Sequence, residues 1–252
     1  MQVKIHIGTS GWSYKDWLGV FYPGNTKQSQ YLPYYASKFN SVEVDSTFYA
    51  IPRRSTVQNW FNITPDEFTF ALKTPQIITH EKRLVGCEKE WNQFIETACL
   101  LKHKLGPIVL QFDYKFKYSD NLSKLDKFLS DHTAVGMKLC VEIRNRDWHK
   151  AQFYDMLRKH KVPLVLNDLY YMPRIIELTG DFVFIRLLGN RKQIPDDFTH
   201  VRVNRDNDLD WWTEWIDKFL EKELEVWVYS NNRYQGHAPS TIYELQKRLD
   251  KF

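Results

Sequence analysis

The sequence predicts an α/β protein built as a single-domain TIM (β/α)8 barrel. Three observations carry this prediction: a length of 252 residues, eight short runs of strand character, and helical patterns in most of the intervals between them. A TIM barrel typically has about 250 residues and eight parallel strands, each followed by a helix. Strands that alternate with helices along a whole chain indicate parallel βαβ units. We therefore expect one domain, residues 1–252.

The predicted strands are short runs rich in branched aliphatic and aromatic residues. They lie at Val3–Gly8, Ser41–Ser46, Phe68–Lys73, Pro107–Phe112, Lys138–Ile143, Pro163–Asp168, Phe182–Leu187 and Glu225–Ser230. Eight is the number that a closed barrel needs, and closure places the first strand beside the last. We therefore expect Val3–Gly8 to pair with Glu225–Ser230.

The intervals between these strands space their apolar residues as helices do. In Glu88–His103, the residues Trp91, Phe94, Ile95 and Ala98 fall on one stripe, near a period of 3.6. The segment Tyr170–Leu178 offers at most a short helix. The predicted helices are Gln28–Phe39, Thr56–Phe61, Glu88–His103, Leu122–Leu129, Ala151–His160, Leu209–Leu220 and Ser240–Leu249.

An open doubly wound sheet is the alternative fold, and it would bind its ligand where the strand order reverses. The turn after the first strand, Gly8-Thr9-Ser10-Gly11, does not fit the dinucleotide pattern G-x-G-x-x-G. The sequence also contains no G-x-S-x-G, P-loop or H-E-x-x-H motif. The familiar nucleotide, hydrolase and zinc-protease signatures therefore do not apply.

The net charge and the cysteine content limit which ligands, metals and cellular locations we expect. The formal net charge is +4, from 35 Lys plus Arg against 31 Asp plus Glu, which suits an anionic ligand but does not indicate nucleic acid. The widely spaced Cys87, Cys99 and Cys140 form no disulfide or zinc pattern, so we expect no structural metal. Reduced thiols and the lack of a long apolar stretch predict a cytoplasmic protein without a signal peptide or membrane span.

Charged or hydrogen-bonding side chains end nearly every predicted strand, where a TIM barrel places its pocket. Burying unpaired charge is costly, so such a ring either pairs internally or meets a polar ligand. The residues that we expect to be catalytic are Glu43, Lys73, His80, Glu142, Asp168 and His237. The residues that we expect to bind substrate are Ser10, Trp12, Tyr14, Asp45, Gln111, Arg144, Arg186 and Asn231.

Each residue type in this set suits a role. The cations would bind anionic groups, while the glutamates and histidines would move protons. Asn231 would orient the ligand. Trp12 and Tyr14 lie in a long aromatic loop from Gly8 to Gln28, where they would stack on the ligand or close over it. The alternative is that these rings cap the barrel as a secondary core.

Several of these residues also have structural interpretations. Residues two apart in a strand project to the same face, so Glu142 could pair with Arg144 instead of serving a ligand. Asp168 could cap the next helix. His237 could shape its turn, and His80 could face solvent. These alternatives stay open on the sequence alone.

The motifs together resemble those of a known family, the YecE-like proteins or domain of unknown function 72. The resemblance runs from Gly8 to about Leu249. Its motifs are Gly8-Thr9-Ser10-Gly11-Trp12-Ser13-Tyr14, Ser41-Val42-Glu43-Val44-Asp45-Ser46-Thr47-Phe48-Tyr49, Phe70-Ala71-Leu72-Lys73-Thr74-Pro75, Val141-Glu142-Ile143-Arg144, and Ser230-Asn231-Asn232 through His237-Ala238-Pro239. The resemblance implies a TIM barrel but no reaction.

This chain departs from that family's pattern at two positions. Asp45 stands where many relatives have Asn, which replaces a neutral donor by a carboxylate. Leu188 stands in Arg186-Leu187-Leu188-Gly189, where relatives often have a histidine. Any mechanism that needs that histidine is therefore either not general in the family or lost here.

Three functions are compatible with these patterns. The first is an enzyme that uses acid–base or hydrolytic chemistry on a small polar or anionic, sugar- or phosphate-like substrate. The alternatives are a nucleic-acid-processing or nucleic-acid-binding protein, whose aromatic loops would stack bases, and a non-catalytic binding barrel. The sequence specifies neither a cofactor nor an oligomeric state.

Overall fold

Two four-stranded parallel sheets form the centre of the molecule in the computed structural model, which describes residues 5–133 and 136–249. Their strand orders are β1-β8-β7-β6 and β2-β3-β4-β5. The strands are β1 (Ile5–Thr9), β2 (Ser41–Val44), β3 (Thr69–Lys73), β4 (Leu105–Gln111), β5 (Leu139–Glu142), β6 (Leu166–Leu169), β7 (Phe182–Gly189) and β8 (Glu225–Ser230). The predicted pairing of the first strand with the last is confirmed, with Ile5 opposite Val226.

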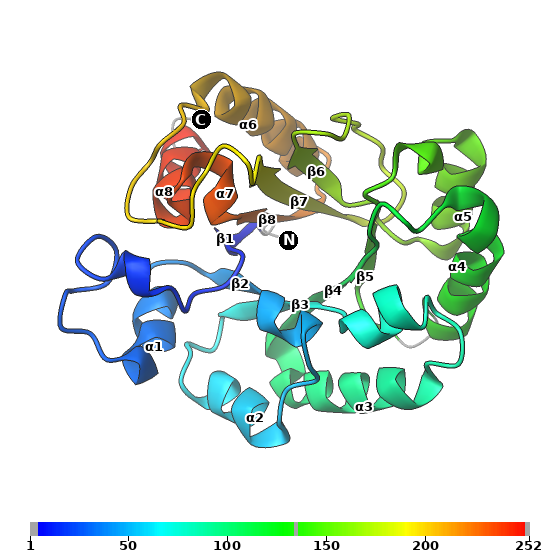
Figure 1. Ribbon diagram of the computed structural model, residues 1–252, viewed down its shortest axis with the longest axis horizontal. Helices are drawn as coiled ribbons and strands as arrows, with labels where there is room; N and C mark the ends of the chain where they lie inside the picture. The colour runs from blue at the N-terminus through cyan, green and yellow to red at the C-terminus, as the bar shows by residue number, and fades with distance from the viewer. Residues whose placement is uncertain (1–4, 134–135, 250–252) are drawn as a thin grey trace.

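Two seams join the sheets through isolated bridges instead of continuous ladders. Ser10 bridges Glu43 between β1 and β2, and the Gly11 N–H donates to the Glu43 carbonyl at 2.8 Å. Val141 bridges Leu164 ahead of β6. The eight strands therefore follow TIM-barrel order as two half-barrels that meet at these seams (Figure 1).

Helices surround the strands (Figure 1). They are α1 (Tyr31–Ala36), α2 (Arg54–Asn62), α3 (Glu88–Ala98), α4 (Tyr118–His132), α5 (Ala151–His160), α6 (Asp206–Glu221), α7 (Asn232–Gln235) and α8 (Ala238–Leu249). Between β6 and β7, residues 170–181 form no helix, in keeping with Pro173, which removes a backbone donor. Within the described residues, no helix is both long and apolar enough to cross a membrane.

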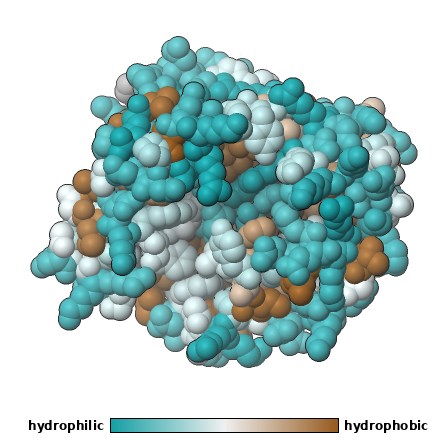
Figure 2. Space-filling model, in the orientation of Figure 1, coloured by the Kyte–Doolittle hydropathy of each residue, from teal (hydrophilic) through white to brown (hydrophobic). Residues whose placement is uncertain are grey.

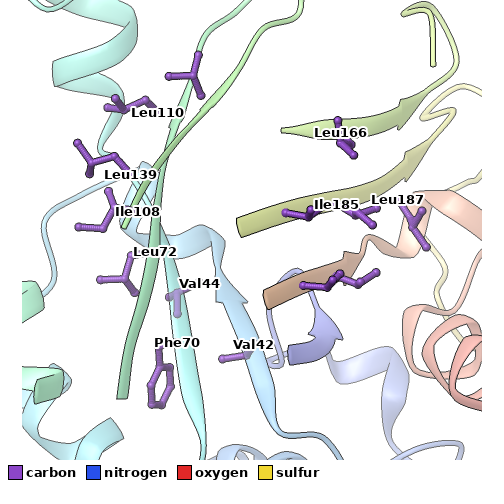
Figure 3. Packing of buried hydrophobic residues seen from close by; sticks show 14 of the residues in the cluster. Val42, Val44, Phe70, Leu72, Ile108, Leu110, Leu139, Leu166, Ile185 and Leu187 are labelled. Atoms are coloured by element: carbon purple, nitrogen blue, oxygen red, sulfur yellow. The ribbon is translucent and has the colours of Figure 1, made fainter. Parts of the chain in front are cut away.

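Side chains alternate between two faces of each strand, which separates the outer core from the barrel interior. Residues such as Val42, Val44 and Leu72 point outward into the helix layer (Figure 3). The interior positions between them form a second, smaller apolar cluster: Ala71, Val109, Cys140, Val165, Phe182, Phe184, Trp227 and Tyr229. On several strands, the residue two positions after a member of this cluster is charged. Because side chains alternate between the two faces of a strand, these charged side chains also point into the barrel.

The N-terminal end of the barrel interior is filled by a paired polar cluster. The His6 ring stacks on Trp227 with centroids 3.6 Å apart. Its Nε2 lies 3.0 Å from a Glu225 carboxylate oxygen, and its Nδ1 lies 3.0 Å from the Thr69 hydroxyl. The second oxygen of Glu225 pairs with Lys138. Stacking and ion pairing therefore satisfy the polar groups at this end, which borders a cavity lined by Lys138, Phe182 and Glu225.

Candidate active site

The C-terminal layer of the interior is built around Arg186, which is 1% exposed. Its Nη2 lies 2.8 Å from Glu43 Oε2, and its Nη1 pairs with Glu142 Oε2. Glu142 ends β5, Glu43 lies one residue before the end of β2, and Arg186 lies in the C-terminal half of β7; all three side chains are buried. These three predicted site residues are therefore in direct contact with one another, and their role in a site stays a prediction.

Two half-exposed charges extend this cluster toward solvent. Arg144 donates from Nε to Glu142 Oε1 at 2.7 Å, so the alternative pairing with Glu142 is the one found. Asp45 Oδ1 lies 3.4 Å from Arg186 Nη2. The side chains of Arg144 and Asp45 keep 26% and 29% of their exposure. Among the described residues, the terminal nitrogens of Arg144 have no hydrogen-bond partner.

The two buried glutamates have opposite electrostatics. Burial alone would raise the pKa of Glu142, but the neighbouring Arg144 and Arg186 guanidiniums lower that pKa to about 2. Burial raises the pKa of Glu43, Asp45 adds to the rise, and Arg186 opposes it. Glu43 Oε2 accepts from Ser10 Oγ at 2.7 Å, while Glu43 Oε1 is buried without a partner. Both carboxylate oxygens of Glu142 therefore have an arginine partner, whereas only one oxygen of Glu43 has a partner among the described residues.

Lys73 ends β3 in the same interior layer and is 9% exposed. No carboxylate among the described residues lies within ion-pair distance of its Nζ, which instead sits 4.0 Å from the centre of the Phe48 ring. Burial lowers the pKa of Lys73 to about 8, against the opposing effect of Asp45. Phe48 was not among the sequence-predicted site residues, although it lies in the motif that follows β2.

His80 and Gln111 border this layer. His80 lies in a π-helical turn, Ile77–Glu81, with its ring edge-on to Phe48 at 4.9 Å and its Nδ1 2.8 Å from the Thr79 hydroxyl. Burial lowers the pKa of His80, which favours the neutral ring near neutral pH. Gln111 is buried and opposes Glu142 in the ladder. His80 is therefore partly exposed to solvent, and it packs against the same Phe48 ring that Lys73 Nζ contacts.

The aromatic loop after β1 serves mainly as a secondary core. Trp17 and Tyr22 are buried, and Trp12 packs edge-on against Trp60 at 5.6 Å. Tyr14 donates its hydroxyl to the Ser10 carbonyl at 2.8 Å, and burial raises the pKa of Tyr14. Tyr14 therefore covers the Ser10 end of the charged cluster, while Trp12 is anchored to the side.

Asp168 does not line this layer, and the expectation that it faces the barrel cavity is wrong. Its Oδ2 accepts from Trp212 Nε1 and from the Tyr234 hydroxyl, each at 3.0 Å, and it pairs with Arg174 at 2.8 Å. Asn167 occupies the interior-facing position opposite Arg186. Asp168 therefore points into the helix layer, where it stabilises the packing of α6 and α7.

Asn231 and His237 also have structural partners. The Asn231 side chain accepts from the Arg233 N–H at 3.0 Å and caps α7. His237 is buried and packs edge-on against Trp17, with its Nδ1 2.7 Å from the Ser240 hydroxyl and its Nε2 buried without a partner among the described residues; burial lowers its pKa to about 4. No hydrogen bond or ion pair in the described part of the chain joins either residue to the charged cluster.

The space-filling view shows hydrophilic residues around a hollow near the centre of the face toward the viewer (Figure 2).

The candidate active site contains three carboxylates, Glu43, Asp45 and Glu142, and three cations, Lys73, Arg144 and Arg186. Within the ranges that the structure describes, no three His, Cys, Asp or Glu side chains gather in a way that could hold a metal ion.

Comparisons with known proteins show which protein family the chain matches. Over residues 6–252 it matches the family described as protein of unknown function DUF72. It is 25% identical to the UPF0759 protein YunF of Bacillus subtilis (strain 168), over 98% of this chain and 95% of YunF. It is 33% identical to the UPF0759 protein YecE of Escherichia coli (strain K12), over 44% of this chain and 39% of YecE.

Solved structures of DUF72 proteins have the same fold as this chain. A DUF72 family protein of Thermotoga maritima superposes with a TM-score of 0.76 and 26% identity, over 98% of this chain and 99% of that one. One from Enterococcus faecalis superposes with a TM-score of 0.80 and 22% identity, over 98% and 95%. A methyltransferase from Methanosarcina mazei, at a TM-score of 0.53 and 12% identity, shares the fold alone. The chain therefore belongs to the DUF72 family, whose function is unknown.

Proposed function

We propose that this protein is an enzyme that transfers protons on a small polar, anionic substrate at the C-terminal end of the barrel. One observation carries the proposal: among the described residues, Glu43 Oε1 and Lys73 Nζ have no hydrogen-bond or ion-pair partner, and neither do the terminal nitrogens of Arg144. Buried polar groups in native proteins are generally hydrogen-bonded, and each exception calls for an explanation, of which a catalytic role is one. The raised pKa of Glu43 and the lowered pKa of Lys73 bring an acid and a base toward neutral pH.

The arginines of the cluster have different roles in this proposal. Arg186 is enclosed by carboxylates, so it positions Glu43 and Glu142 instead of meeting the substrate. Arg144 is half-exposed and keeps its terminal nitrogens free, which suits bidentate binding of a phosphate or carboxylate. The substrate's anionic group would bind Arg144, and its reacting carbon would lie between Lys73 and Glu43.

Anion binding gives the first test of this proposal. Isothermal titration calorimetry with inorganic phosphate should detect binding to the wild-type protein. Binding should weaken at least about tenfold in Arg144→Gln, because a bidentate charged contact is lost. Arg158→Gln is the matched control, since Arg158 lies on α5 and pairs with Asp155 and Glu177. No binding, or equal binding by both variants, contradicts the proposal.

Proton transfer itself is tested by hydrogen exchange. Sugar phosphates and phosphorylated hydroxy acids incubated with the enzyme in D₂O should include one whose carbon-bound hydrogen exchanges, as followed by proton NMR. Glu43→Gln and Lys73→Met should each reduce the exchange by at least about a hundredfold, which is typical of losing a general acid or base. Exchange that persists in both variants would rule out these residues.

A nucleic-acid substrate is the second candidate, and a concentration of charge favours it. Segments that follow seven strands at the C-terminal end hold 15 Lys plus Arg against 7 Asp plus Glu, although the whole chain carries only +4. These segments are residues 10–30, 45–53, 74–87, 112–117, 143–150, 190–205 and 231–237. Tyr49 and Tyr114, in the same segments, are 74% and 66% exposed and could stack on bases.

Fluorescence anisotropy with a single-stranded oligonucleotide distinguishes this candidate. A nucleic-acid enzyme should bind at about 50 mM salt, lose affinity steeply as salt rises, and bind less tightly as Tyr114→Ala. The proposal of a small anionic substrate instead predicts no binding of the oligonucleotide and unchanged phosphate binding by Tyr114→Ala.

A further inference from the structure

The side-chain amine of Lys73 differs from that of the other deeply buried lysine, Lys104. Lys104 Nζ donates to the Phe61 carbonyl at 2.7 Å and to the Thr64 carbonyl and hydroxyl at 2.8 and 3.3 Å. Lys73 Nζ donates to no group among the described residues and lies 4.0 Å from the centre of the Phe48 ring. Burial lowers the pKa of both lysines, but within the described residues hydrogen bonds to protein acceptors offset part of that cost at Lys104 and not at Lys73.

The charges around Lys73 do not require its cation. Glu142 is held by two arginines, and the paired oxygen of Glu43 is held by Arg186 and Ser10. Asp45 Oδ1 lies 3.4 Å from Arg186 Nη2, within ion-pair distance. The titratable and charged groups that face Lys73 from the packed elements are Glu43, Asp45, His80, Glu142, Arg144 and Arg186. Two of these are arginines, which oppose protonation of the amine.

We propose that Lys73 is a covalent catalytic residue, whose amine forms an imine with the carbonyl group of a small anionic substrate. This inference rests on the proposed function, because it uses the same site and the same anion contact at Arg144. A lysine that is desolvated, near other cations and free of hydrogen-bond acceptors is the arrangement that activates an amine as a nucleophile. A purely anion-binding lysine would keep its full charge at neutral pH.

The chemistry balances with one proton from solvent. The neutral amine adds to the carbonyl carbon, a C–N bond forms, the carbonyl π bond breaks, and the oxygen takes up the proton that the nitrogen gives up. The hydroxyl of the resulting carbinolamine takes a proton from solvent and leaves as water, while the nitrogen lone pair forms the C=N bond of a protonated imine. The imine withdraws electrons from the adjacent carbon, whose hydrogen is then acidic enough for a carboxylate base. Glu43 Oε1, which has no partner among the described residues, is the group that would take this proton.

Reductive trapping tests the inference directly. The protein is incubated at pH 7 with glyoxylate, a small anionic aldehyde, and sodium cyanoborohydride, and modified lysines are mapped by mass spectrometry. Lys73 should be labelled at least about tenfold faster than the exposed Lys127, since about a tenth of an amine with a pKa near 8 is uncharged at this pH. The labelling of Lys73 should saturate with glyoxylate concentration, and Lys104 should stay unlabelled.

Variants separate the two proposals. Arg144→Gln should slow the labelling of Lys73 by glyoxylate but not by glycolaldehyde, which is neutral. If Lys73 is labelled no faster than Lys127 while the protein still binds phosphate through Arg144, the imine inference is overturned and the proposed function stands. If phosphate binding is also absent, the proposed function fails with it.

Discussion

The two ends of the barrel interior bury charge in different ways. At the N-terminal end, His6, Thr69, Lys138 and Glu225 bond to one another, and within the described residues the Trp227 indole nitrogen is the buried atom of this cluster without a partner. At the C-terminal end, Arg186 contacts three carboxylates, yet a carboxylate oxygen and an amine have no partner in the part of the chain that the structure describes. The first cluster is therefore paired internally to a greater extent than the second.

On the proposed function, this difference separates the charges that serve stability from those that serve chemistry. A structural ion-pair network lowers its free energy by completing its pairs, whereas a site that must bind a substrate keeps donors and acceptors available. By this criterion Glu142, Arg186 and Glu225 are structural members. Glu43, Lys73 and Arg144 are the groups that a ligand would complete.

The largest effect is expected from Glu142→Gln, which removes the carboxylate shared by Arg144 and Arg186. Breaking a buried ion pair leaves a cation without its partner, so the free energy of unfolding should fall by about 3–5 kcal/mol. Urea unfolding at pH 7 measures the change. A loss below about 1 kcal/mol would mean that Glu142 belongs with the groups available to a ligand.

The same residue predicts an acid dependence. Its pKa of about 2 lies below the ordinary value of 4.5, so its contribution to stability is complete above pH 4.5 and disappears as pH falls toward 2. Wild type and Glu142→Gln should therefore converge in stability across this interval. Thermal unfolding between pH 2 and 6 follows it, and parallel curves would show that the carboxylate adds nothing.

A smaller effect is expected at the opposite end from Glu225→Gln. This carboxylate pairs with His6 and Lys138, and its pKa is about 2, but it is partly exposed and therefore partly screened by solvent. We expect unfolding to become easier by about 1–2 kcal/mol, with phosphate binding unchanged. Weakened phosphate binding would show that the two layers are coupled.

The smallest effect on stability is expected from Glu43→Gln. Its pKa is raised by burial, so the charged form opposes folding above the ordinary pKa, and an uncharged amide removes that cost. Stability at pH 7 should change by less than about 1 kcal/mol or increase, while proton exchange on the substrate is lost. A loss as large as that of Glu142→Gln would make Glu43 a structural residue.

The sequence was sufficient to predict the strand order and most of the charged cluster. Glu43 lies between Val42 and Val44, and Lys73 follows Leu72, so their interior position follows from the alternation of faces. The interruption of pairing at Ser10 and at Val141 has no comparable signal, because it depends on how two half-barrels meet.

Asp168 shows why face assignment fails for some strands. In Val165-Leu166-Asn167-Asp168, two apolar residues precede two polar ones, and a strand buried on both faces does not reveal which polar residue points inward. The partners of Asp168 come from α6 and α7, far away in the sequence. Likewise, Lys73 lacks a partner because distant arginines occupy the carboxylates, and no local pattern predicts this.

The central claim is that the C-terminal layer keeps groups that cost stability. A pair of matched variants, Lys73→Met and Lys104→Met, tests it by urea unfolding at pH 7. Because the pKa of Lys73 lies near 8 instead of 10.5, its burial costs up to about 3 kcal/mol when charged, so Lys73→Met should raise the free energy of unfolding by about 1–3 kcal/mol. Lys104→Met should lower it by about 2–4 kcal/mol, since three acceptors lose their charged donor. Equal losses in both variants would contradict the account and make Lys73 part of the scaffold.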